Sequence, residues 1–263
     1  MASRKEQKEQ ARARRLAEEQ ARTARARRDR RLRMIGGVAV LAVAIVAVLI
    51  AVSSGGSSAT GLQTGKTQTQ TVAAVTKLLT GIPQSGATLG NTKAPVTMTY
   101  YGDLECPVCR DFTLSAGFPQ LVTNEVRAGK VQVVFKAFQT ATQDPNVFKT
   151  QQAAALAAGQ QQRFWDYTEL FYHEQGTEAS GYVNDAYLSG LAKQVAGLDL
   201  SKWNSARTSS TLRNQVAAEE QAGGTIGVSA TPTLVVRGPS GKQASATGVL
   251  QYTDLQNLIK KVA

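Results

Sequence analysis

The sequence predicts an α/β fold in which a helical segment interrupts a mixed sheet, and three observations carry this prediction. The first is an apolar strand at 96–101 that leads through a short turn into a helix with two cysteines. The second is a strand at 131–138 with apolar side chains on both faces, a pattern typical of the interior strands of α/β sheets. The third is a pair of strands, 231–236 and 243–247, followed by a helix with apolar residues at helical spacing.

The chain contains only two cysteines, Cys106 and Cys109. Two residues three positions apart share a helix face with their Cβ atoms about 5–6 Å apart, which is close to the separation of a disulfide. Pro107 suits the first position of a helix and puts Cys106 at the helix N-terminus, where free N–H groups and the helix dipole favour a thiolate. The pair predicts a reversible redox couple. A structural disulfide and half of a metal site are the alternatives.

The first 33 residues form a strongly basic segment, with thirteen Lys or Arg and five Asp or Glu. Their net charge of +8 accounts for most of the +11 of the whole chain. Residues 1–33 have almost nothing apolar to bury, so they cannot form a core. We interpret them as a cytoplasmic tail that sets topology and attracts anionic membrane lipid, with no nucleic acid as partner.

Residues 34–52 carry no charge and predict a transmembrane helix. At about 1.5 Å per residue they span roughly 28 Å, close to the hydrocarbon thickness of a bilayer. Arginines precede this run and no charge follows it before Lys66, so the tail is expected in the cytoplasm and the rest outside. The predicted location is the cell membrane, with a single span. The alternative is a cleaved signal peptide, although the apolar run exceeds the usual length of about 7–15 residues.

Residues 53–84 are expected to be a linker and a lead-in to the folded domain. The part 53–71 is rich in Ser, Gly, Thr and Gln, a composition typical of flexible linkers. A short helix is expected at 72–79, with turns at 81–84 and 89–91 around a short first strand.

The domain itself is expected at 85–263, with a helical insertion at about 146–222. Apolar residues within this insertion follow helical spacing: Leu188, Leu191, Ala192 and Val195. Phe164 and Trp165 are interpreted as core residues of another helix. The Gly223-Gly224 pair is expected to end the last helix of the insertion.

Several of these segments together resemble the DsbA-like thiol–disulfide oxidoreductases of the thioredoxin superfamily, in their membrane-anchored bacterial form. The resemblance covers about 85–263 and implies a thioredoxin-like fold with an inserted helical domain, preceded by a single transmembrane helix. Its residues are Leu89-Gly90, Ala94-Pro95-Val96-Thr97, Asp103, Cys106-Pro107-Val108-Cys109 and Ala230-Thr231-Pro232-Thr233.

The resemblance also implies roles for individual residues. Cys106 would be the attacking, solvent-facing thiolate and Cys109 the buried resolving cysteine. Pro232 would be a cis-proline beside the disulfide, and the backbone of Thr231 would pair with an extended substrate peptide by strand addition. Without the resemblance, Pro232 is only a proline that opens a strand.

Two features depart from the strongly oxidising members of that family. Val108 stands where those enzymes often have a histidine that helps the thiolate, and it donates no side-chain hydrogen bond. Glu105 places a negative charge next to Cys106, which opposes thiolate formation. We therefore expect a couple less oxidising than the roughly −120 mV of DsbA.

The expected function is the introduction of disulfides into secreted or membrane proteins outside the cytoplasm. Reduced or misoxidised secreted proteins would be the substrates, and a membrane-bound, quinone-linked thiol oxidase would reoxidise the pair. No cofactor and no metal are expected, and His173 is interpreted as structural. The alternatives are a reductase or isomerase fed with electrons through the membrane, a metal-delivery module, and a non-catalytic binding module with a structural disulfide.

Overall fold

The structure is a computed structural model that describes residues 61–263. Contacts divide the chain into two units, of which Gly56–Ala263 is the second and contains all the described residues. The predicted basic tail, the predicted transmembrane helix at 34–52 and the beginning of the linker lie outside the described residues. Among the helices of residues 61–263, none has the length and apolar character needed to cross a membrane.

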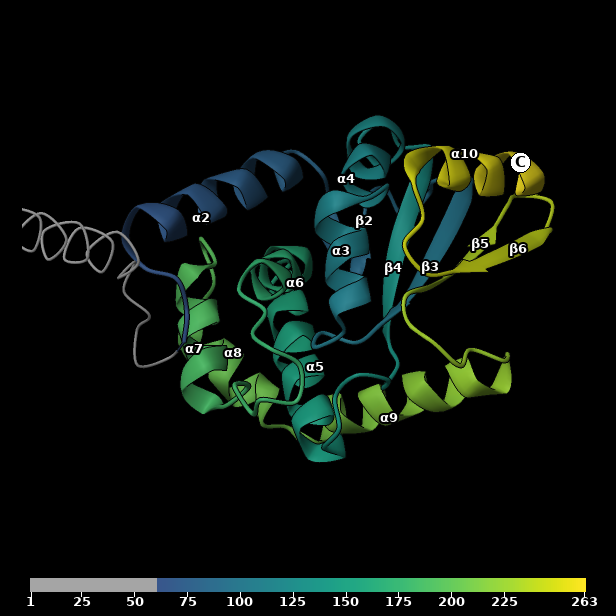
Figure 1. Ribbon diagram of the computed structural model, residues 1–263. Helices are drawn as coiled ribbons and strands as arrows, with labels where there is room; N and C mark the ends of the chain where they lie inside the picture. The colour runs from purple at the N-terminus through teal and green to yellow at the C-terminus, as the bar shows by residue number, and fades with distance from the viewer. Residues whose placement is uncertain (1–60) are drawn as a thin grey trace, which may run out of the picture. The chain divides into compact units, whose positions relative to one another are not determined.

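A six-stranded sheet forms the centre of the described unit, in the order β1-β2-β4-β3-β5-β6 (Figure 1). β3 and β4 run parallel, and every other neighbouring pair is antiparallel. The strands are β1 (Gln84–Ser85), β2 (Thr88–Leu89), β3 (Val96–Gly102), β4 (Val131–Ala137), β5 (Thr233–Arg237) and β6 (Gln243–Thr247). Four of the five predicted strands are therefore present, with ends that differ by up to two residues. In place of the short first strand expected between the turns at 81–84 and 89–91, the structure has two strands of two residues each, β1 and β2.

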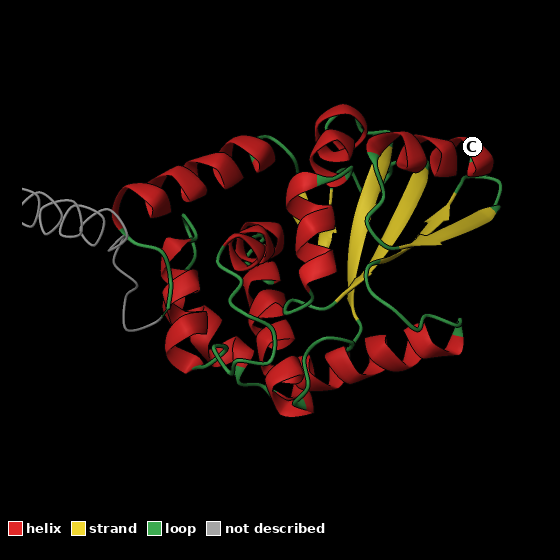
Figure 2. Cartoon of the chain, viewed as in Figure 1, coloured by secondary structure: helices red, strands yellow, loops and turns green. Residues whose placement is uncertain are grey.

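Helices surround the sheet, and α5 to α8 are grouped beside it, on the side away from β6 (Figures 1 and 2). The first group comprises α2 (Gly65–Leu79), α3 (Pro107–Ser115), α4 (Phe118–Leu121) and a π-helical turn, η1 (Val122–Val126). The second group comprises α5 (Pro145–Gly159), α6 (Phe164–His173), α7 (Asp185–Gln194), α8 (Leu200–Arg207) and α9 (Ser210–Thr225), and α10 (Tyr252–Val262) ends the chain. The predicted helical insertion between the strand pairs is confirmed.

One face of the sheet carries the aromatic core. Tyr100 of β3 packs edge-on against Phe112 of α3 at 5.3 Å between ring centroids and against Phe135 of β4 at 5.1 Å. Phe118 stacks on Trp165 at 5.3 Å, which joins α4 to α6. All five rings are at most 2% exposed, so the core extends from the sheet into the insertion.

The other face of the sheet is covered less completely than the sequence predicts. β4 is an interior strand, and its side chains alternate between buried and half-buried along its whole length. Val134 is half-buried, on the face that α9 crosses. Lys136 on the same face pairs with Glu219 of α9 at 3.0 Å. The apolar pattern of 131–138 thus identifies an interior strand but overstates the cover on its second face.

Residues 65–71 are helical, so the prediction of a flexible linker over 53–71 is wrong for this part. They form the first two turns of α2, a helix of 15 residues. Val75 and Leu79 of α2 are each 3% exposed, and Arg127 donates to the carbonyl oxygens of Thr80 at 2.7 Å and Leu78 at 2.8 Å. α2 is therefore packed onto the domain and held at its C-terminal end.

The Gly223-Gly224 pair lies in the last turn of α9, so the predicted helix end is one residue early. α9 continues to Thr225, and Gly227 follows with a φ of +85°. Because only glycine adopts such a φ without strain, Gly227 is the residue that allows the chain to turn away. Gly223 has another purpose: a Cβ there would lie 2.8 Å from the Phe138 ring and 3.0 Å from the Tyr101 ring.

Candidate active site

The end of β3 delivers the cysteine pair to the start of α3. After Gly102 the chain turns, and the Cys106 N–H donates to the Asp103 carbonyl oxygen at 3.1 Å. Cys106 is the N-cap of α3 with extended φ and ψ of −71° and 117°, and Pro107 occupies the first helical turn. The sequence predicted this arrangement, because proline is compatible with a first helical position and its missing N–H has no partner to lose there.

The two cysteines are free thiols with unequal surroundings. Cys109 is completely buried, whereas Cys106 is 5% exposed. Between them Val108 is 41% exposed, so an apolar side chain faces solvent beside the pair. Both thiols are therefore buried, and the prediction that Cys106 faces solvent is wrong, because the segment around Thr231 packs against its sulfur.

A segment far along the chain completes the site. The Thr231–Pro232 peptide bond is cis, as the resemblance implies. The Cys106 thiol donates to the Thr231 carbonyl oxygen at a distance of 3.6 Å across 125 positions of sequence. Antiparallel pairing of β5 with β3 brings these residues together, because β5 begins directly after Pro232 and Tyr101 pairs with Thr233.

The surroundings give the two thiols opposite acidities. The pKa of Cys106 is lowered to about 6, mainly by a hydrogen bond from Cys109 and then by the Thr231 side chain and the N–H groups of Val108 and Cys109, while burial acts against this. The pKa of Cys109 is raised well above its usual value, first by burial and then by Cys106. At neutral pH the pair therefore holds a thiolate at Cys106 and a thiol at Cys109.

Glu105 precedes the pair and is 5% exposed. Burial raises the pKa of its own carboxyl group, which weakens the negative charge that the sequence placed beside Cys106. The pKa of Cys106 is low in spite of this neighbour.

Asp103 is a site residue whose role the sequence did not reveal. Its carboxylate is completely buried and accepts hydrogen bonds from three successive N–H groups, those of Thr140, Ala141 and Thr142, at 2.9 Å each. It also accepts from the Glu105 N–H at 3.1 Å. Asp103 thus fastens the loop after β4 to the turn that carries the cysteines.

The helical insertion contacts the same turn through Gln175, a second residue that sequence reasoning missed. Its side-chain amide donates to the carbonyl oxygens of Leu104 at 2.7 Å and Cys106 at 3.2 Å. Beneath Cys109, the Tyr100 hydroxyl donates to the Cys109 carbonyl oxygen at 3.3 Å and lies 3.4 Å from the Tyr172 hydroxyl. Tyr100, Tyr172 and Gln175 lie far apart in the sequence. Because they have no fixed spacing from the cysteines, no sequence motif could reveal them.

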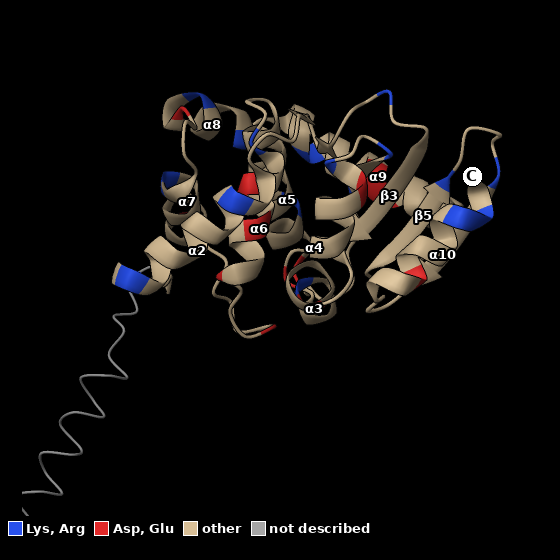
Figure 3. Ribbon diagram, turned by 90° about the horizontal axis from the view of Figure 1, so that it is seen from above, with Lys and Arg blue, Asp and Glu red and all other residues tan. Residues whose placement is uncertain are grey.

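Other candidate features lie apart from the pair. His173 ends α6, is half-buried, and has a pKa lowered by burial. In the part of the chain that the structure describes, no group of three or more His, Cys, Asp or Glu could hold a metal ion. Lys and Arg occur on several elements, α2, α7 and α10 among them (Figure 3).

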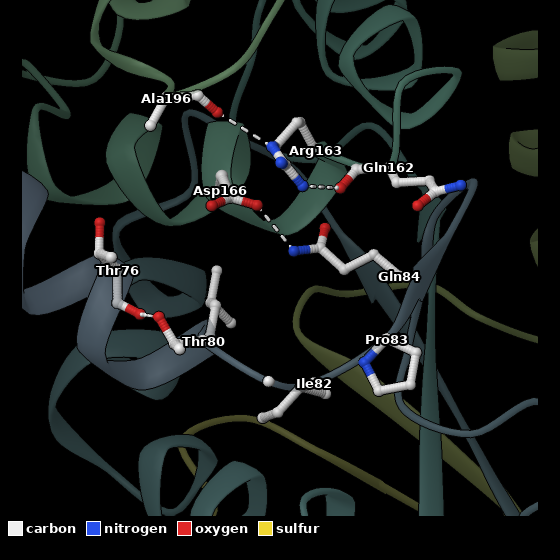
Figure 4. Close-up of a pocket in the computed structure, with 11 residues that line it drawn as sticks. Thr76, Thr80, Ile82, Pro83, Gln84, Gln162, Arg163, Asp166 and Ala196 are labelled. Atoms are coloured by element: carbon white, nitrogen blue, oxygen red, sulfur yellow. Dashed lines mark hydrogen bonds between the residues drawn. The ribbon is translucent and has the colours of Figure 1, made fainter.

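A cavity of about 370 Å³ lies where the C-terminal end of α2 meets the start of α6, and neither cysteine lines it. Figure 4 shows its polar contacts: Gln84 donates to Asp166 at 2.7 Å, and Arg163 donates to the Ala196 carbonyl oxygen at 3.0 Å. These bonds join β1 to α6 and α6 to the loop after α7, so the groups around the cavity stabilise the packing of the insertion.

Residues 84–261 match the family model described as Thioredoxin. Disulfide bond formation protein D of Bacillus subtilis is 28% identical over 156 residues, which are 56% of this chain and 66% of that protein. The Na⁺/H⁺ antiporter NhaA 1 of Mycolicibacterium gilvum is 33% identical over 169 residues, which are 62% of this chain and 25% of that protein. The chain thus spans a quarter of the antiporter's length and about two thirds of the Bacillus protein's length.

Solved structures share the fold. Oxidised BdbD from Bacillus subtilis has a TM-score of 0.57 at 22% identity and covers 68% of this chain and 97% of its own. The α-DsbA1 protein of Wolbachia pipientis has a TM-score of 0.57 at 17% identity, over 70% of this chain and 92% of its own. The predicted thioredoxin-like fold with a helical insertion is therefore confirmed, and the chain belongs to the thioredoxin family that this model describes.

Proposed function

We propose that the protein introduces disulfides into secreted or membrane proteins outside the cytoplasm by exchange at Cys106 and Cys109. The observation that carries this proposal is the unequal acidity of the pair, whose Cys106 sulfur lies 3.6 Å from the Thr231 carbonyl oxygen. A cysteine with a low pKa is a good leaving group, and a stabilised thiolate makes the disulfide form a stronger oxidant.

The exchange takes two steps from the oxidised enzyme. A substrate thiolate attacks the Cys106 sulfur, a mixed disulfide forms, and the Cys106–Cys109 bond breaks with its electron pair on Cys109, which takes up a proton. A second substrate thiolate then attacks the substrate sulfur of the mixed disulfide, and Cys106 leaves as a thiolate. The substrate gains a disulfide and the enzyme is left with two reduced cysteines.

Two further parts of the proposal concern the surroundings of the enzyme. Because the chain has only these two cysteines, another molecule must reoxidise them. We assign this step to a membrane-bound, quinone-linked thiol oxidase. The uncharged run at 34–52 would hold the domain outside the membrane near this partner and near reduced secreted proteins.

The reverse direction is the second candidate function, because the same pair can reduce disulfides when electrons reach it through the membrane. The feature that favours it is Val108, which supplies no side-chain donor to the thiolate. In this case the reduced form would be stabilised less and the couple would be a weaker oxidant.

The reduction potential of the full chain, equilibrated with glutathione, separates the two directions. A value above about −180 mV, near protein disulfide isomerase or higher, is expected of an oxidant. A value near the roughly −270 mV of thioredoxin would reject the oxidant and favour the reductase. The Cys106→Ser variant is the control, and it should neither oxidise nor reduce a peptide with two cysteines.

A further inference from the structure

The loop after β4 carries Thr140, whose hydroxyl forms a hydrogen bond with the hydroxyl of Thr231. Thr231 in turn contacts Cys106: its carbonyl oxygen lies 3.6 Å from the Cys106 sulfur. The Thr231 side chain is also among the groups that lower the pKa of Cys106. The hydroxyl of Thr140 is therefore hydrogen-bonded to the residue whose backbone contacts the Cys106 sulfur.

The chemistry of the sulfur decides the direction of these hydrogen bonds. A thiolate has no proton and only accepts, and a hydroxyl has one proton to donate. When Cys106 is a thiolate, a hydrogen bond between it and the Thr231 hydroxyl requires Thr231 to be the donor. The Thr231 oxygen is then free to accept the proton of Thr140, and each of the two bonds strengthens the other.

Asp103 holds Thr140 in the position that its hydrogen bond to Thr231 requires. The Asp103 carboxylate accepts from the Thr140 N–H at 2.9 Å and from the next two N–H groups at the same distance. It also accepts from the Glu105 N–H, one residue before Cys106, at 3.1 Å. One buried carboxylate therefore holds both the loop that carries Thr140 and the turn that carries Cys106.

We infer that Thr140, fastened by Asp103, is a positioning residue that directs the Thr231 hydroxyl toward the Cys106 thiolate. Within the proposed function, on which this consequence rests, the Thr231 hydroxyl stabilises Cys106 at the moment it leaves the mixed disulfide. The proton stays on Thr231, and the electron pair of the broken S–S bond stays on Cys106.

The variant that tests the inference is Thr140→Val, with Thr140→Ser as its matched control. Valine keeps the N–H that Asp103 binds and the shape of threonine but has no hydroxyl, whereas serine keeps both. Titration of the thiolate absorbance of the reduced full chain against pH gives the pKa of Cys106 directly. We expect Thr140→Val to raise this pKa by about one unit, a tenfold change in the ionisation constant, and Thr140→Ser to leave it unchanged.

A second pair of variants tests the part of Asp103. Asp103→Asn places an NH₂ group, itself a donor, against the N–H groups of residues 140–142, so the loop after β4 should detach from Asp103. The pKa of Cys106 should then rise at least as much as in Thr140→Val. A variant with both Asp103→Asn and Thr140→Val should show no further rise in the pKa of Cys106, because both changes break the same series of hydrogen bonds from Asp103 through Thr140 to Thr231. Asp111→Asn, which removes an exposed carboxylate of α3, is the control and should leave the pKa unchanged.

Equal pKa values in the wild type, Thr140→Val and Thr140→Ser would overturn the inference. Circular dichroism of each variant verifies that the chain remains folded, and Thr140→Val retains every bond of Asp103. The proposed function can fail separately. If the wild type oxidises no dithiol peptide while Thr140→Val still raises the pKa, the oxidant is rejected and the positioning role of Thr140 stands.

Discussion

The chemistry of the site depends on how differently two thiols three positions apart are surrounded. Cys106 caps a helix and receives hydrogen bonds, whereas Cys109 lies one turn deeper and is completely buried. Burial disfavours a thiolate, and hydrogen bonds to the thiolate favour it. The pKa is therefore lowered at Cys106 and raised at Cys109, one helical turn away. The mechanism needs this difference, because one sulfur must leave easily and the other must remain protected.

The low pKa of Cys106 predicts how its reactivity changes with pH. Alkylation by iodoacetamide requires the thiolate, so its rate in the reduced chain should rise with pH, reach half its plateau at about pH 6, and stay constant up to about pH 8. Below the pKa the thiol is protonated and the rate should fall about tenfold per pH unit. Mass spectrometry of peptides assigns the label.

Cys106→Ser is the control for this measurement and should remove the fast labelling at every pH. Cys109 should remain unlabelled in the folded chain, because it is buried and its pKa is raised. A half-maximal rate near pH 8.5, the usual pKa of a cysteine, would contradict the assignment of Cys106 as the thiolate.

At this scale the sequence predicts the pair and its redox chemistry but not the residues that hold it in place. Cys106, Pro107 and Cys109 are close in sequence, and their spacing alone places them on a helix start. The support from Asp103, Thr140 and Gln175 depends on loops that meet only after the sheet has formed. No local pattern encodes such contacts, although Asp103 was among the residues that carry the family resemblance.

At the scale of single elements, α9 shows that a glycine near a helix end can be required for close packing. Glycine often follows the last residue of a helix, so Gly223-Gly224 predicts an end. In the structure α9 continues through both, and Gly223 lies against the rings of Phe138 and Tyr101. The sequence cannot distinguish a glycine that ends a helix from one that allows a helix to approach a sheet.

Two neighbouring substitutions in α9 test this explanation. Gly223→Ala places a Cβ within 3.0 Å of two rings and should lower the free energy of unfolding by about 1–3 kcal/mol. Gly224→Ala meets nothing within 4 Å and should raise it by about 0.5–1 kcal/mol, because alanine favours a helix over glycine. Urea unfolding of the two variants gives both values, and effects of the same sign and size would reject the close approach.

At the scale of the whole described unit, α2 belongs to the folded domain although its sequence resembles a linker. Residues 65–71, Gly-Lys-Thr-Gln-Thr-Gln-Thr, contain no apolar side chain, so composition alone indicates a flexible segment. Their helix is continuous with the turn that buries Val75 and Leu79, and the Gln63 N–H donates to Glu174 at the end of α6 at 2.7 Å. Tertiary packing, which periodicity in so short a run cannot reveal, stabilises this helix.

This packing predicts that a core residue of α2 contributes to the stability of the entire domain. Leu79 is 3% exposed, so Leu79→Ala should lower the free energy of unfolding of the full chain by about 2–4 kcal/mol, from lost burial and the cavity left behind. Lys77→Ala, at an exposed position of the same helix, should change it by at most about 0.5 kcal/mol. Neither variant should shift the pKa of Cys106, because α2 supplies none of the groups that lower it. If Leu79→Ala and Lys77→Ala unfolded at the same urea concentration, α2 would be a tether beside the domain and the linker predicted from its composition would be restored.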